Sequence, residues 1–282
     1  MLAAHLSPVA PVILIARPRR LAAELSFRLR DEQGTRAITL PQCSPSTPGP
    51  AVKRLIVATK AQDALPAVES VAPSLADDCA LLLMQNGMGS QEAIVARFPG
   101  LSIHAASSTE GAYREAPDTV VHAGRGITRI GLLNGATVDW VGLFRAAQLE
   151  AEPVERIEWH LANKLRINCL INPLTVVYDC RNGALLEDAH ALDQMRKLGE
   201  QADAVLSAAG FTFTEPAFDA ACTVARATAA NRSSMLQDAR AGRRTELDYM
   251  TGYLLRLAER YGFDADEHRA LYRELMARFP RN

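Results

Sequence analysis

The sequence predicts an α/β N-terminal domain, built on a doubly wound parallel sheet, followed by an all-α C-terminal domain. In the first half of the chain, short apolar segments rich in β-branched residues alternate with helical stretches. After about residue 155 the strand pattern nearly ends, and long segments with helical periodicity follow. A length of 282 residues exceeds that of the usual single domain. We therefore expect two domains, at residues 1–155 and 156–282.

The composition excludes several classes of protein. Hydrophobic residues make up 48% of the chain and charged residues 22%, as in ordinary globular proteins. A net charge of −1 provides no field that would attract nucleic acid or an anionic membrane. No apolar run approaches the ~18 residues of a membrane helix, and arginines follow the first apolar run, whereas a signal peptide has its charges first. The five cysteines are scattered and never spaced CxxC, which is typical of reduced thiols in a cytoplasmic protein without a zinc site.

The elements of the first domain follow one another in a regular order. Apolar runs predict strands at 12–15, 55–58, 80–84 and 102–106, with shorter strands at 119–122 and 128–132. Between them we expect a loop over 44–50, a helix over 62–71 and a turn at Gly124 and Gly126. Uninterrupted apolar strands separated by helices are typical of a parallel sheet covered on both faces. In the second domain, helical periodicity covers 189–208, 216–238 and 245–261.

A basic turn, Arg17-Pro18-Arg19-Arg20, directly follows the first of these strands. In doubly wound, Rossmann-like folds the second strand ends beside the adenosine ribose of a bound dinucleotide. A carboxylate there binds the 2′-hydroxyl of NAD, whereas arginine accommodates the 2′-phosphate of NADP. No acidic residue occupies this corner. A solvated surface turn explains the arginines equally well in isolation, but the surrounding strand pattern favours NADP, bound through Arg17.

The phosphate-binding fingerprint of such a domain is absent. GxGxxG should lie about 20 residues before the basic turn, but residues 2–6 already fall within the helix that should follow it. The strand before this loop is central in the order 3-2-1-4-5-6, so its absence predicts a gap within the sheet. A start codon assigned too late, a truncated product and an unusual completion of the fold all remain open. We expect the in-frame DNA upstream to encode an apolar strand and GxGxxG, and an in-frame stop there would contradict this.

A stripe of polar residues lies on an otherwise apolar helical segment. Lys164, Asn168 and Asn172 are spaced i, i+4, i+8 and therefore share one face of a helix. Buried amide and ammonium groups are costly without partners, so the stripe requires a polar ligand or an internal network. The structural alternative is a network that holds a helix kink at Pro173.

Two other clusters are less specific by themselves. Asn86 lies in QNGMGS, directly after a predicted strand. Asn-Gly is most often only a turn, but the carboxyl ends of strands in open α/β sheets bind ligands. Glu246 lies in RRTELDY, where Thr245 and Asp248 fit a loose capping box. Taken alone, this cluster favours a plain acidic residue in the first turn of a helix.

Together the segments QNGMGS, NKLRINCLINPLT and NRSSMLQDxRxxRRTELDYMTGYL resemble the ketopantoate reductase family, over about residues 12–261. By this resemblance Lys164 matches the catalytic lysine of the family, and Glu246 its substrate-binding glutamate at the catalytic centre. The remaining matches are Asn168, Asn172 and Ser234, which would hold the substrate, and Asn86 and Lys60, which would lie where nicotinamide and substrate meet. The sequence departs from the family in lacking the glycine loop, and this departure bears on the affinity for the cofactor but not on the resemblance itself.

The resemblance implies NADPH-dependent reduction of a small 2-keto acid, ketopantoate, to pantoate, with Lys164 donating the proton. Two alternatives stay open. One is a catalytically silent homologue that binds a metabolite or partner, and the other is a reductase of another branched 2-keto acid. The sequence does not decide between a monomer and a homodimer.

Overall fold

The computed structural model describes residues 1–16, 22–45 and 51–279. The chain forms two compact units. The first comprises Met1–Thr59, Asp63–Gln85 and Ala93–Ile157. The second begins at Glu158 and also includes two short segments from earlier in the chain, Lys60–Gln62 and Asn86–Glu92.

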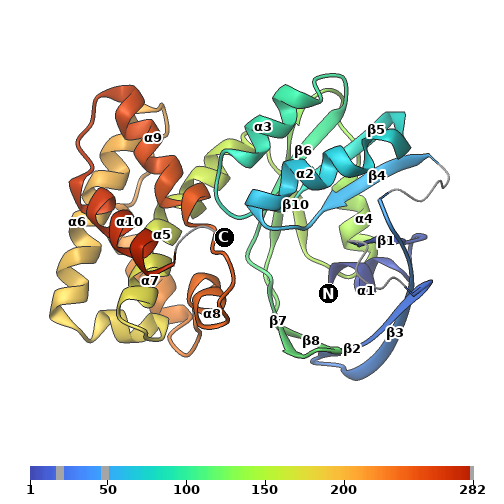
Figure 1. Cartoon of the computed structure of the whole chain (residues 1–282), viewed down its shortest axis with the longest axis horizontal. Coiled ribbons are helices and arrows are strands. Elements are labelled where there is room, and N and C mark those ends of the chain that lie inside the picture. The colour runs from blue at the N-terminus through green and yellow to red at the C-terminus, as the bar shows by residue number, and fades with distance from the viewer. Residues whose placement is uncertain (17–21, 46–50, 280–282) are drawn as a thin grey trace. The chain divides into compact units, whose positions relative to one another are not determined.

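The first unit contains every strand found among the described residues, with a few helices between them (Figure 1). Its strands are β1 (Leu14–Ile15), β2 (Glu24–Asp31), β3 (Gly34–Cys43), β4 (Val52–Val57), β5 (Leu75–Leu83), β6 (Ser102–Ser108), β7 (Gly111–Ala116), β8 (Thr119–Gly124), β9 (Thr128–Asn134) and β10 (Ala151–Pro153). Its helices are α1 (Leu2–Leu6), α2 (Ala61–Val71), the 3-10 turn η1 (Ala72–Ser74), α3 (Ser90–Arg97) and α4 (Trp140–Ala146). The first residues of α2 and α3 are grouped with the second unit.

The strands form two five-stranded sheets. One has the order β10-β9-β6-β5-β4, in which β4, β5 and β6 run parallel and β9 is antiparallel to β6. The other has the order β1-β3-β2-β8-β7, with β2 and β3 forming an antiparallel hairpin. Gly34 closes this hairpin with a φ of +117°, a backbone conformation that favours glycine. β8 and β9 therefore follow each other in the chain but belong to different sheets.

The core of the first unit packs against the parallel strands. Leu82 of β5 and Ala106 of β6 contact the fully buried Trp140 and Phe144 of α4, and Leu6 of α1 joins the same cluster. Figure 1 shows α2 and α4 on opposite faces of this sheet. Because both faces are covered, the strands contain continuous apolar runs instead of alternating apolar and polar residues.

Among its described residues, the second unit consists of helices joined by loops and contains no strand. Its elements are α5 (Ile157–Val177), η2 (Asn182–Leu186), α6 (Ala189–Ala208), α7 (Ala217–Ala227), α8 (Ser234–Arg240), η3 (Leu247–Tyr249), α9 (Thr251–Tyr261) and α10 (Asp266–Arg278). α6 contacts α7, α9 and α10. No helix in the described ranges is long and apolar enough to cross a membrane.

The predicted fold class is confirmed, but the single sheet is not. β1 lies at the edge of one sheet and β4 at the edge of the other. The hairpin of β2 and β3 was not predicted, because its polar, mostly exposed residues show no apolar run. In the second unit, the segments predicted at 216–238 and 245–261 are each divided into two helices.

Candidate active site

The polar stripe lies on α5, as its spacing predicts. Leu165 and Leu170 of the same helix are buried in the core. Asn172 is buried, and its Nδ2 donates to the Sδ of Met250 at 3.6 Å. Asn168 is half-buried, and its side chain makes no hydrogen bond within the part of the chain that the structure describes. An amide in this position can bind a polar ligand without first breaking a protein contact.

Lys164 is half-buried on the same face of α5. Burial lowers the pKa of its ammonium group from 10.5 to about 8, because the charged form loses solvation. The negative charge of Glu246 opposes this fall. The lysine is therefore mostly protonated at pH 7, yet gives up its proton far more readily than an exposed lysine does. These are the properties required of a general acid near neutral pH.

Glu246 precedes the 3-10 turn η3, but its carboxylate binds at the N-terminus of another helix, α2. Its Oε1 accepts a hydrogen bond of 3.0 Å from the backbone N–H of Ala61, the first residue of α2. The side chain of Asn86 also hydrogen-bonds to Glu246. Burial raises the pKa of Glu246, while the Ala61 N–H, Lys60 and Asn86 each act in the opposite direction. The loose capping box is only partly formed, since Thr245 Oγ1 accepts from Leu247 N at 3.4 Å and a 3-10 turn, η3, begins there.

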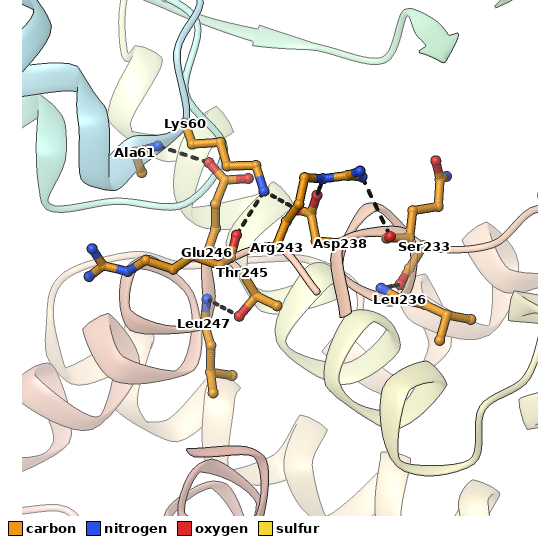
Figure 2. Close-up of polar contacts among 11 residues, drawn as sticks. Lys60, Ala61, Ser233, Leu236, Asp238, Arg243, Thr245, Glu246 and Leu247 are labelled. Carbon is orange, nitrogen blue, oxygen red and sulfur yellow. Dashed lines mark hydrogen bonds and ion pairs between the residues drawn. The ribbon is translucent and has the colours of Figure 1, made fainter. Parts of the chain in front are cut away.

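Lys60 joins two segments that are far apart in the sequence. Its Nζ forms an ion pair with Asp238 of α8 and donates to the backbone oxygen of Arg244 at 2.8 Å. The Nε of Arg243 donates to the other carboxylate oxygen of Asp238 at 2.9 Å. Figure 2 shows Lys60, Asp238 and Glu246 pointing toward one another. This network holds the residues after β4 against the segment that contains Glu246.

A glycine fixes the loop that contains Asn86. Gly87 has a φ of +79°, and a Cβ at this position would lie 2.2 Å from the backbone oxygen of Tyr249. The same oxygen accepts a 2.8 Å hydrogen bond from Met88 N. Only glycine allows the loop to approach η3 this closely. Asn86 is thereby held beside Glu246.

The two serines of the NRSSMLQD segment lie in different surroundings. Ser233 is buried and is the N-cap of α8, accepting from Leu236 N at 3.0 Å. Ser234, the predicted substrate contact, is the exposed first residue of α8. Arg17, the predicted NADP contact, lies outside the described residues. No cluster suited to a metal ion occurs among the described residues.

Asp238 was not singled out from the sequence. It is buried, four residues after Ser234 on α8, and is the common partner of Lys60 and Arg243. The i, i+4 spacing from Ser234 was the available signal, because residues at that spacing share a helix face.

A Rossmann-like α/β unit combined with an all-helical unit that contains a buried glutamate and a lysine of lowered pKa is an architecture of two-domain oxidoreductases. The model described as "Ketopantoate reductase PanE/ApbA" matches residues 1–135, and its C-terminal counterpart matches residues 156–278. The chain belongs to the ketopantoate reductase family.

Individual relatives agree with this assignment. The chain is 35% identical to the 2-dehydropantoate 2-reductase of Yersinia pestis over 235 residues, covering 79% of this chain and 73% of the relative. It is 33% identical to that of Archaeoglobus fulgidus over 224 residues, covering 76% and 72%. A solved structure described as a probable 2-dehydropantoate 2-reductase from Bacillus subtilis aligns with a TM-score of 0.81 at 28% identity, covering 98% of this chain and 94% of the other. A family structure from Ralstonia eutropha aligns at 0.89 with 24% identity, covering 98% and 93%, and supports the fold.

Proposed function

We propose that this protein reduces ketopantoate (2-dehydropantoate) to pantoate, with NADPH as the hydride donor. The observation that carries the proposal is Lys164, a half-buried lysine with a pKa of about 8 that interacts with the charge of the buried Glu246. The unpartnered amide of Asn168 lies one turn away on the same helix. A proton donor beside unsatisfied hydrogen-bonding groups suits a small polar substrate.

Two residues of the second unit fit the reactive end of a nicotinamide cofactor. Lys60 and Asn86 follow the carboxyl ends of the parallel strands β4 and β5, where open α/β sheets bind their ligands. When bound, NADPH supplies the hydride that reduces the keto carbon. We further propose Arg17 as the contact for the 2′-phosphate. The sequence contains no GxGxxG near these strands, so we assign no residues to the pyrophosphate.

The remaining roles follow from charge and hydrogen bonding. As the keto oxygen gains negative charge, the ammonium group of Lys164 stabilises it and donates the proton. Asn168, Asn172 and Ser234 bind the carboxylate and hydroxyl groups of the substrate. Glu246 accepts a hydrogen bond from a hydroxyl group of the substrate, while its other contacts hold the loop of Asn86 in place. Groups of this kind discriminate against analogues that lack the polar partner.

The test is the oxidation of NADPH by the purified protein in the presence of ketopantoate. We expect kcat/KM to be higher with NADPH than with NADH at one fixed salt concentration, and Arg17→Ala to narrow that preference by weakening NADPH. Equal values for the two cofactors would contradict the assignment of Arg17. A panel of branched 2-keto acids tests the substrate, because a reductase of another acid would prefer that acid. Binding of ketopantoate without NADPH oxidation would identify a silent homologue.

We also propose a homodimer. A solved structure from Staphylococcus aureus is described as a dimeric ketopantoate reductase, and it shares the fold at 21% identity. The molar mass from light scattering would decide between the monomer and the dimer.

A further inference from the structure

A cleft of about 600 Å³ on the helical unit has no role in the proposed reaction. Its lining comes from the residues that begin α3, from η3 and from α9. Among the lining residues are three arginines: Arg244, Arg256 and Arg260. Neither Lys164 nor any residue of the α5 stripe lines the cleft, so it is a separate site.

The guanidinium groups of the cleft are weakly neutralised. Both Nη atoms of Arg256 donate to the backbone oxygen of Asp248, at 3.3 Å each, and this acceptor carries no net charge. The guanidinium group of Arg260 makes no hydrogen bond or ion pair to any of the described residues and lies 5.7 Å from the ring centroid of Tyr261. Arg244 lies 3.7 Å from the carboxylate of Asp248, which is a long ion pair. Arginines arranged in this way keep most of their donors available.

The two carboxylates of the cleft are already engaged by protein donors. Glu92 accepts from Gly89 N at 2.8 Å and from the hydroxyl of Tyr253 at 3.0 Å. Asp248 accepts from the hydroxyl of Tyr272. Three guanidinium groups therefore line the cleft together with two carboxylates, and the ion pair between Arg244 and Asp248 is a long one, at 3.7 Å. The cleft retains a net positive charge and an excess of hydrogen-bond donors.

We propose that this cleft binds a small phosphate-bearing ligand. The planar guanidinium group matches phosphate geometry and can donate two parallel hydrogen bonds. Arg256 and Arg260 are spaced i, i+4 on α9, so a phosphate group can contact both. Tyr249 and Leu257 provide apolar surface for the rest of the ligand. A volume of about 600 Å³ is typical of small-molecule sites.

The experiment is isothermal titration of the purified full chain with inorganic pyrophosphate. We expect saturable binding that weakens as salt increases. The variant Arg256→Gln/Arg260→Gln should bind at least tenfold more weakly. The matched control is Arg269→Gln/Arg273→Gln, which removes two arginines with the same i, i+4 spacing from α10, outside the cleft; Arg269 is half-buried and Arg273 is exposed. The control should bind as the unmodified protein does.

The proposal would be overturned by the absence of saturable binding, or by equal weakening in the cleft variant and the control. Unchanged binding in the cleft variant would also overturn it, because pyrophosphate would then occupy another site. Circular dichroism establishes that each variant is folded. If the double variant is unfolded, Arg260→Gln alone replaces it, since this side chain makes no polar contact with the described residues. The single variant should still bind several-fold more weakly than the control.

Discussion

Replacement of Lys164 by methionine should strongly lower activity and stabilise the protein at the same time. A fall in pKa from 10.5 to about 8 means that folding disfavours the protonated lysine. One pKa unit corresponds to about 1.4 kcal/mol, so the protonated form costs the native state about 3 kcal/mol at most. Because Lys164 is half-buried, solvent screening reduces this cost to about 1–2 kcal/mol. Methionine has a similar length and carries no charge, so the variant should regain this free energy at pH 7.

The assay combines kinetics with thermal unfolding. We expect kcat for Lys164→Met to fall by roughly 10²–10⁴, the range for losing a positioned general acid. Its melting temperature at pH 7 should rise. The free energy of unfolding of the unmodified protein should rise relative to that of the variant as pH rises from about 8 toward 10.5. The reason is that the folded protein releases the Lys164 proton at a lower pH than the unfolded chain does. The kcat of the unmodified protein should fall as pH rises through about 8, since the acid is then deprotonated.

The matched control is Lys197→Met. Lys197 lies on α6 with 52% of its side chain exposed and forms a surface ion pair with Asp193. This variant should leave the turnover unchanged and should keep the gain in stability that the release of the Lys164 proton gives between about pH 8 and 10.5. The reasoning on Lys164 would be refuted if Lys164→Met kept its turnover, or if it melted below the unmodified protein at pH 7.

Two more substitutions test the surroundings of Lys164. Glu246→Gln keeps an acceptor for Ala61 N–H, so we expect a nearly unchanged melting temperature but a loss of tenfold or more in kcat/KM, about 1.4 kcal/mol. Burial raises the pKa of Glu246, so the activity of the unmodified protein should fall at acidic pH as this carboxylate is protonated, and Glu246→Gln should lose that dependence. A drop in stability with unchanged kinetics would instead make the glutamate purely structural. Gly87→Ala should destabilise by more than about 1 kcal/mol, since alanine is strained at positive φ and its Cβ would clash with Tyr249. It should also lower kcat by displacing Asn86, and normal turnover in a folded Gly87→Ala protein would show that this loop tolerates movement.

Local periodicity was sufficient to predict much of this protein. The α5 stripe of Lys164, Asn168 and Asn172 follows from 3.6 residues per turn, and α6 has the bounds that its pattern predicts. The buried strands β5 and β6 were found because a sheet covered on both faces requires continuous apolar runs. These features depend on neighbours in the sequence, so the sequence alone contains them.

Contacts between distant segments were decided only by the tertiary structure. The local pattern around Glu246, taken alone, favoured an acid in the first turn of its own helix, yet its carboxylate accepts the first N–H of α2, 185 residues earlier. The pairing of Lys60 with Asp238 joins residues 178 positions apart, and no local pattern indicates it. The polar hairpin of β2 and β3 and the division of the strands into two sheets were likewise hidden from the sequence. Periodicity in the sequence indicates which face of a helix or strand is buried. The pKa of Lys164 and the hydrogen-bond partners of Glu246, by contrast, depend on which distant segments pack against these two residues.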